Sequence, residues 1–308
     1  MTTGTATPPS APTVRLDSAP SGSAATKSKR LNLGVAGWLA AGWLGLLLIL
    51  AVLAPVLPIP DPNTSFAEIA RKGPSAGHLL GGDTIGRDLL SRIIYGTRAS
   101  FAVGFGSIAF GFIVGGIIGL MAGFFRGKVD GILTPLMNIL LAIPQFILAL
   151  SLVNVFASGG EVTSARRLVV LIVGLGVVSV PLLGRITRAN TLAWSEREFV
   201  LAARAMGAKN WRIMLRDVLP NVLPSMIAIG LLGVGIAIVA EGGLALFGVG
   251  VQSPTPSWGN IISEGQSQMR NAPHIVVATS VVLFLTVMAL NFLGDLISQR
   301  FGVKESAL

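Results

Sequence analysis

Long stretches without a charged side chain constrain this sequence more than any other feature. A helix needs about 20 largely apolar residues to cross the hydrocarbon core of a membrane. Six stretches meet or approach this requirement, namely residues 31–60, 99–125, 131–160, 168–184, 218–240 and 271–294. The shortest, 168–184, lies between Arg167 and Arg185, and we expect it to lengthen by placing Arg185 at the interface. The pattern predicts an all-α polytopic membrane protein with six transmembrane helices.

The charge content excludes an ordinary soluble enzyme. Only 12% of the residues are charged, whereas soluble domains average about 25%. There is no cysteine and there are two histidines, His78 and His274. Disulfides and thiolate metal sites are therefore excluded, and no metal site is expected. A net charge of +9 would indicate a nucleic-acid partner in a soluble protein, but in a membrane protein it reflects topology. No nucleic-acid partner is expected.

The distribution of basic residues predicts the orientation. The segments on the N-terminal side of the membrane hold 15 of the 23 Lys and Arg residues, which places both termini in the cytoplasm of a bacterial inner membrane. Residues 1–30, rich in Ser, Thr, Pro and Ala, are predicted to be a disordered cytoplasmic tail. Residues 31–60 are predicted to be a retained transmembrane anchor, since they are too long for a signal-peptide core.

The remaining boundaries follow from this topology. We predict an extracytoplasmic loop or elbow and a permease core that contains a long cytoplasmic loop, followed by a short tail. The extracytoplasmic loop or elbow is residues 61–98. The permease core is residues 99–303, with the cytoplasmic loop at 191–220, and the tail is residues 304–308.

The cytoplasmic loop has a distinctive pattern, EFVLAARAMGAKNWRIMLRDVLP at residues 198–220. It predicts two short helices, because Gly207 can adopt a left-handed conformation and end the first one. Ala202 and Ala203 allow another backbone to approach closely, and Pro220 suits the first turn of the next helix. An apolar stripe at helical spacing is formed by Trp211, Met214, Leu215 and Val218. By physics alone, a helix lying on anionic lipid and a docking surface for a protein are equally supported.

This loop resembles the "EAA" loop of bacterial ABC importer permeases. Ala202, Ala203, Gly207, Leu219 and Pro220 match that pattern, and Glu198 precedes the alanine pair as it does in peptide importers. Asp217 departs from the pattern, which has an apolar residue or a histidine there.

Two further regions extend the resemblance. HLLGGDTIGRDLLSRIIYG at 78–96, together with LFGVGVQSPTPSWGN at 246–260 and NFLGD at 291–295, resembles the C-type permease subunit of dipeptide and oligopeptide importers. The resemblance covers about residues 30–303 and implies the type I ABC importer permease fold.

The resemblance also implies a mechanism and partners. In that family the loop is a coupling helix seated in a groove of an ATPase subunit, so ATPase coupling falls to Glu198, Ala202, Ala203, Gly207, Leu219 and Pro220. The chain has no phosphate-binding loop of its own. It is therefore expected to be non-catalytic and without a cofactor, with ATP and Mg²⁺ on two partner ATPase subunits. A second, related permease subunit, an extracytoplasmic solute-binding protein and membrane lipids complete the expected partners.

Four polar residues in apolar stretches are candidates for the transport pathway or its gate, namely Asn138, Gln145, Asn154 and Glu241. The three amides could equally form hydrogen bonds between helices. Glu241 could contact the pathway, or the helix could break at the following Gly242–Gly243 and leave Glu241 as a cap, or Glu241 could lie near the outer interface. Pro144 is expected to kink its helix.

The remaining motif and the cargo leave alternatives open. Asp83, Gly86, Arg87 and Asp88 have too few acidic ligands for calcium, so a structural or binding-protein-facing elbow is expected. His274 is expected at an interface. Besides di- and oligopeptides, the same type of importer could carry nickel, glutathione or haem. A non-ABC channel or secondary transporter is disfavoured by the loop.

Overall fold

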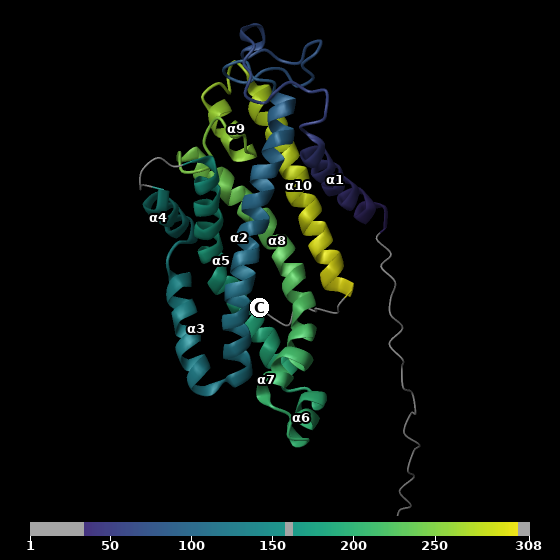
Figure 1. Cartoon of the computed structure of the whole chain (residues 1–308), viewed down its shortest axis with the longest axis vertical. Coiled ribbons are helices and arrows are strands. Elements are labelled where there is room, and N and C mark those ends of the chain that lie inside the picture. Colours follow the sequence, from purple (N-terminus) through teal and green to yellow (C-terminus); the bar gives the residue numbers. More distant parts are fainter. Residues whose placement is uncertain (1–33, 158–162, 301–308) are drawn as a thin grey trace, which may run out of the picture. The chain divides into compact units, whose positions relative to one another are not determined.

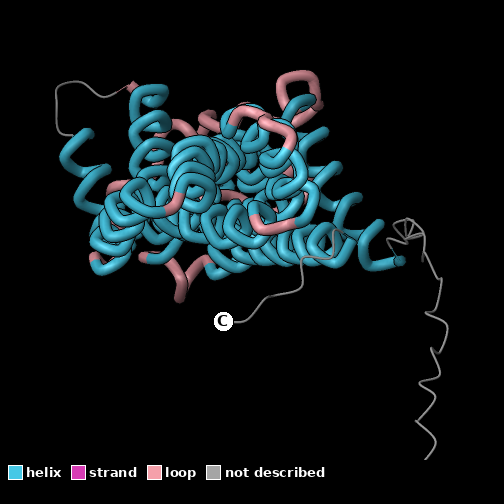
Figure 2. Tube along the Cα trace, turned by 90° about the horizontal axis from the view of Figure 1, so that it is seen from below, coloured by secondary structure: helices cyan, strands magenta, loops and turns pink. Residues whose placement is uncertain are grey.

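The computed structural model describes residues 34–157 and 163–300 of the chain. Within these residues all the regular elements are helices, apart from isolated β-bridges (Figures 1 and 2). The order is α1 (Gly34–Leu53), η1 (Ala67–Ile69), α2 (Leu89–Phe125), α3 (Gly127–Ala142), α4 (Gln145–Ala157), α5 (Ser164–Ser195), α6 (Glu198–Ala205), α7 (Asn210–Ile213), the π-helical η2 (Met214–Val218), α8 (Leu219–Leu246), α9 (Trp258–Gln266) and α10 (Pro273–Arg300). The predicted tails 1–30 and 304–308 lie outside the described residues.

Five helical stretches among the described residues are long and apolar enough to cross a membrane: α1, α2, α5, the continuous stretch of α7, η2 and α8 (Asn210–Leu246), and α10. The sixth predicted span is α3 followed by α4, which are bent by 89° at their junction. The break follows from Pro144, because the residue before a proline is driven out of the helical region. Ile143 is accordingly extended, with φ −80° and ψ 131°. The prediction of a merely kinked third helix is therefore wrong.

Two other predicted boundaries change. Asp88 caps α2, accepting a hydrogen bond of 2.8 Å from the backbone N–H of Ser91, so residues 89–98 are helical and only the first part of the predicted 61–98 loop is irregular. Helix α5 is far longer than the apolar run 168–184 that predicted it. It continues through the first residues of the predicted loop 191–220, which begins after Ser195.

Helices α2 and α5 pack closely along a stripe of glycines on α2, at Gly111, Gly115, Gly119 and Gly123. A Cβ on Gly119 would meet the carbonyl oxygen of Gly184 well inside contact distance. Since that neighbour is backbone, the two helices would have to separate. The four-residue spacing of the stripe thus fixes how α5 lies on α2.

A Gly119→Ala substitution is expected to destabilise the protein by about 1–3 kcal/mol, the usual range for overpacking. The matched control is Gly131→Ala in α3, where a Cβ would meet nothing within 4 Å. This control should be neutral or stabilising, because alanine favours helix. Thermal unfolding of the detergent-solubilised protein measures both, and an unchanged midpoint for Gly119→Ala would contradict the packing argument.

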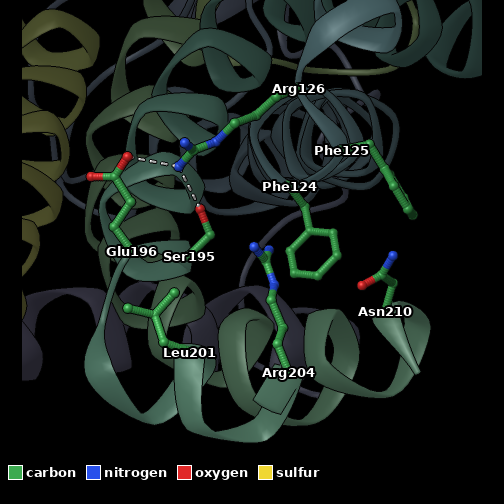
Figure 3. Close-up of a pocket in the computed structure, with 8 residues that line it drawn as sticks. All are labelled: Phe124, Phe125, Arg126, Ser195, Glu196, Leu201, Arg204 and Asn210. Atoms are coloured by element: carbon green, nitrogen blue, oxygen red, sulfur yellow. Dashed lines mark hydrogen bonds and ion pairs between the residues drawn. The ribbon is translucent and has the colours of Figure 1, made fainter. Parts of the chain in front are cut away.

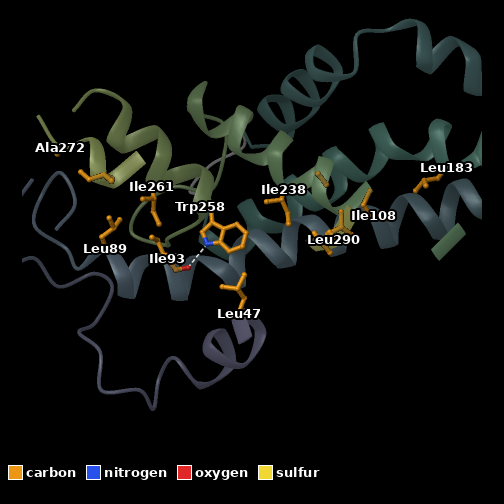
Figure 4. Close-up of a cluster of buried hydrophobic side chains, with 13 residues drawn as sticks. Leu47, Leu89, Ile93, Ile108, Leu183, Ile238, Trp258, Ile261, Ala272 and Leu290 are labelled. Atoms are coloured by element: carbon orange, nitrogen blue, oxygen red, sulfur yellow. Dashed lines mark hydrogen bonds between the residues drawn. The ribbon is translucent and has the colours of Figure 1, made fainter. Parts of the chain in front are cut away.

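The core between α2, α8, α9 and α10 is centred on Trp258, which is fully buried (Figure 4). Its indole N–H donates to the carbonyl of Ile93 at 3.1 Å, and its backbone N–H donates to the hydroxyl of Ser100 at 3.0 Å. Helix α1 joins this core through Leu47. The short helix α9 is thereby fixed against the start of α2.

Candidate functional site

The connecting loop, defined here as residues 196–218, joins α5 to α8 and lies at the lower end of the helices in Figure 1, which we call the loop end. Helix α6 ends as the sequence predicts, because Gly207 has φ +79°. The N–H of Ala208 donates to the carbonyl of Ala203 and the N–H of Gly207 to that of Arg204, both at 3.0 Å. These two bonds form a Schellman motif, which reverses the chain between α6 and α7.

The loop is held to the ends of the long helices by a buried apolar cluster. Its members are Leu120, Phe124, Val200, Ile213, Met214, Val218, Val222 and Met226. Burial of these side chains excludes water from the inner face of the loop. The loop is therefore a packed element with one buried and one exposed face.

The predicted apolar stripe divides between the two faces. Met214 and Val218 are buried, whereas Trp211 is 59% exposed and Leu215 lies partly open. The prediction of a single stripe is wrong because α7 is only four residues long and continues into a π-helical turn, which shifts the register of the later residues.

The six proposed coupling residues occupy two places. Glu198 lies in the first turn of α6 and is exposed, as is Ala202, while Ala203 packs partly against the buried cluster. Gly207 lies at the exposed reversal, and an added Cβ there would meet nothing within 4 Å. Leu219 and Pro220 lie in the first turn of α8, where Leu219 packs against the same buried cluster as Ala203.

A pocket of about 440 Å³ lies between α6 and the end of α2 (Figure 3). Arg126 donates to Glu196 at 2.9 Å and to Ser195 at 3.2 Å, which ties the end of α2 to the end of α5. The guanidinium of Arg204 lies 5.4 Å from the ring centre of Phe124. The pocket thus has a polar edge and an aromatic wall at the place where α6 meets the long helices.

The pathway candidates are not brought together. Asn138 and Asn154 are exposed on α3 and α4, and Gln145 lines a cleft of about 390 Å³ between α4, α5 and α8. Apart from Gln145 and Ser179, the side chains that line this cleft are apolar.

Glu241 lies within α8, which continues through Gly242 and Gly243 to Leu246. The suggested helix break at these glycines is therefore wrong. The carboxylate is fully buried and accepts a hydrogen bond of 2.9 Å from the hydroxyl of Ser257, the N-cap of α9. Gly259 approaches the same carboxylate closely. Glu241 thus joins α8 to α9 within the chain.

At the opposite end of the helices, which we call the elbow end, lies a charge cluster in which all but Glu264 are buried, and the sequence did not predict the part that Arg92 and Glu264 take in it. It consists of Asp83, Arg87, Arg92 and Glu264. Arg87 bonds both Asp83 and Glu264 at 2.5 Å. Arg92, fully buried, lies 3.2 Å from Glu264 and 3.3 Å from Asp83.

This elbow cluster explains the motif around Asp83 as structural. It joins the segment before α2 to α9, and Arg92 donates a further hydrogen bond of 3.0 Å to the side-chain oxygen of Asn260. His274 reinforces the junction with a contact of 3.1 Å between Nε2 and the carbonyl oxygen of Gly82. One signal was available: Glu264 is the only acidic residue between Glu241 and Asp295. Such an isolated charge needs a partner when it is buried.

Comparison with known proteins assigns this arrangement to a family. Residues 115–303 match the family described as "Binding-protein-dependent transport system inner membrane component". The chain is 35% identical over 258 residues to the glutathione transport system permease protein GsiD of Pectobacterium atrosepticum, covering 83% of each chain. It is 34% identical over 252 residues to the dipeptide transport system permease protein DppC of Alkalihalophilus pseudofirmus, covering 80% of this chain and 79% of that one.

The fold has solved counterparts. The inward-facing MetNI methionine ABC transporter matches with a TM-score of 0.56 and 22% identity, over 69% of this chain and 97% of that one. One family accounts for these observations. They are the apolar helices, the packed loop between α5 and α8, and relatives of similar length. The chain belongs to the binding-protein-dependent transport system inner membrane components, the membrane-spanning permease subunits of ABC importers.

Proposed function

We propose that this permease imports di- or oligopeptides, or a peptide-like cargo such as glutathione, when a solute-binding protein delivers them. The proposal rests on the two relatives named for glutathione and dipeptide transport. Glutathione is itself a small peptide, so both names describe one chemical class. This class is favoured over nickel and haem, the other cargoes considered.

The single observation that supports the coupling mechanism is the connecting loop. Helix α6 is exposed on one face and packed on the other by the buried cluster around Met214. A force applied to such an element is transmitted to α2 and α8 rather than absorbed by a mobile loop. We propose that an ATPase subunit docks on α6, with Glu198, Ala202, Ala203 and Gly207 at the contact and Leu219 and Pro220 at the junction with α8.

The remaining parts of the proposal follow from this arrangement. Both termini and the loop end lie in the cytoplasm, and ATP with Mg²⁺ binds to the ATPase subunits. A second permease subunit completes the pore, and the chain itself carries out no chemistry. The cleft that contains Gln145 is the proposed wall of the pathway, while Asn138 and Asn154 make contacts between helices or subunits. Glu241 acts in packing and gating through α9.

The test is uptake by proteoliposomes that contain this permease with its partner permease, its ATPases and its binding protein. Labelled dipeptides, longer peptides, glutathione, nickel and haem are compared at equal concentrations. ATP-dependent accumulation of the peptides or glutathione is expected, without accumulation of nickel or haem. Uptake of nickel or haem alone would overturn the assignment of cargo, and uptake by this chain without an ATPase would overturn the mechanism.

A further inference from the structure

A basic surface on the connecting loop has no role in the proposed function. It is formed by Lys209, Arg212 and Arg216, which with Trp211 and Leu215 line an open depression. All three basic residues are exposed. Within the described residues, no ion pair includes any of them. The surface therefore presents three cations without a counterion from this part of the chain.

An apolar groove of about 300 Å³ begins at the edge of this basic surface. It runs between α2 and α8, with Ile113, Ile117 and Met121 on one side and Leu223 and Met226 on the other. No charged side chain lines it. Both α2 and α8 are long enough to cross a membrane, so the groove lies at a depth that acyl chains reach.

Two residues belong to both the basic surface and the groove. Trp211 and Leu215 line each of them, so the cations lie directly at the mouth of the apolar groove. Trp211 is largely exposed. Exposed tryptophan is typical of the boundary between acyl chains and headgroups, because its ring is apolar and its N–H is polar.

We propose that this composite site binds one anionic phospholipid. The headgroup lies on Lys209, Arg212 and Arg216, and an acyl chain lies in the groove between α2 and α8. The charge matches an anionic headgroup, and the apolar groove matches an acyl chain, so the two halves together select one kind of molecule. A water-soluble protein could use the cations but would leave the groove inside the membrane unfilled. The site is separate from the cleft that contains Gln145.

A lipid at this place would act on coupling. It would contact α7 and η2, which connect α6 to α8, and would hold Trp211 at a fixed depth. Each basic residue near an anionic membrane surface contributes about fivefold to binding, so the loss of two is expected to weaken it about 30-fold.

The test is retention of lipid by the full-length chain, purified in mild detergent from vesicles with equal amounts of phosphatidylglycerol and phosphatidylcholine of the same acyl composition. Native mass spectrometry counts each bound lipid. The wild type should retain phosphatidylglycerol in preference. An Arg212→Gln/Arg216→Gln variant should lose this retention about 30-fold. The charge-matched control is Lys72→Gln/Arg270→Gln, two exposed cations at the elbow end, and it should behave as the wild type.

A second pair of variants tests the groove without changing charge. Ile117→Trp should fill the groove and lower retention of phosphatidylglycerol, whereas Ile132→Trp, at an exposed isoleucine of α3 outside the groove, should not. This pair decides the question if the arginine variant does not fold.

Several results would overturn the proposal. These are equal retention of both lipids by the wild type, equal losses in the two charge variants, or unchanged retention in Ile117→Trp. If the Arg212→Gln/Arg216→Gln variant retains phosphatidylglycerol as the wild type does, but its assembled importer loses the ATPase subunits, the cations contact a protein and not a lipid.

Discussion

A Gly207→Trp variant of this permease is expected to retain ATP hydrolysis by its partner subunits while cargo uptake falls by about tenfold or more. Gly207 lies at the exposed reversal of the connecting loop, with φ +79°, and a loss of about 1.4 kcal/mol in coupling would correspond to a factor of ten. The new ring would also occupy the open space beside the reversal, where the ATPase is proposed to dock. Uptake and hydrolysis are measured together in proteoliposomes.

The chain offers a closely matched control for this variant. Gly127 also has a positive φ, +51°, and an added Cβ there would meet nothing within 4 Å. It is the first residue of α3 and does not belong to the connecting loop. Gly127→Trp therefore introduces the same side chain and a similar strain, and it should leave the ratio of uptake to hydrolysis unchanged. Normal uptake by Gly207→Trp, or an equal loss in both variants, would show that the loop does not couple the two activities.

An Arg92→Met variant is expected to lose about 3 kcal/mol of the free energy of unfolding. Removing one partner from a buried ion pair costs about 3–5 kcal/mol, and Arg87 remains here to compensate part of the charge of Asp83 and Glu264. The side chain of Arg92 and the carboxylate of Asp83 are buried, so water cannot solvate Asp83 in its place, whereas Glu264 is partly exposed. Thermal unfolding of the detergent-solubilised protein measures the loss.

Arg270→Met is the control for this substitution, because Arg270 is exposed at the same end of the helices. Its unfolding midpoint should match that of the wild type. A double-mutant cycle with Glu264→Gln should give a coupling energy of about 1 kcal/mol or more, as is usual for residues in one charged network. Additive effects of the two substitutions, or an unchanged midpoint for Arg92→Met, would mean that the elbow cluster does not join α2 to α9.

Local sequence predicted where helices end or bend at residues whose type restricts or widens the backbone conformation. Gly207 was expected to end a helix and does so, and Pro144 was expected to kink the third span, which bends at that place but breaks into two helices. The sequence did not predict how far the chain turns there. The 89° bend is set by α4, which packs on α5 through Ala149 and Val153.

Local sequence failed where partners distant in the chain decided the outcome. Two glycines after Glu241 left a helix break open as one alternative, yet α8 continues there, where α9 packs against it and Ser257 bonds the buried carboxylate. The apolar stripe from Trp211 to Val218 assumed one regular helix, whereas the π-helical turn and the end of α2 bury only part of it. In both cases helical periodicity was a weaker constraint than tertiary packing.

The sequence by itself determined the class of this protein, since charge-free stretches of membrane length leave the backbone no alternative to helices in lipid. It also located the loop that is proposed here to couple the permease to its ATPase. Only the tertiary structure decided which charges form ion pairs, because Asp83 and Glu264 are 181 positions apart and meet through Arg87 and Arg92. It alone brought the cations of the loop to the mouth of the groove between α2 and α8. Hydrophobicity is a property of each residue along the chain, whereas ion pairs and grooves exist only once distant segments have packed.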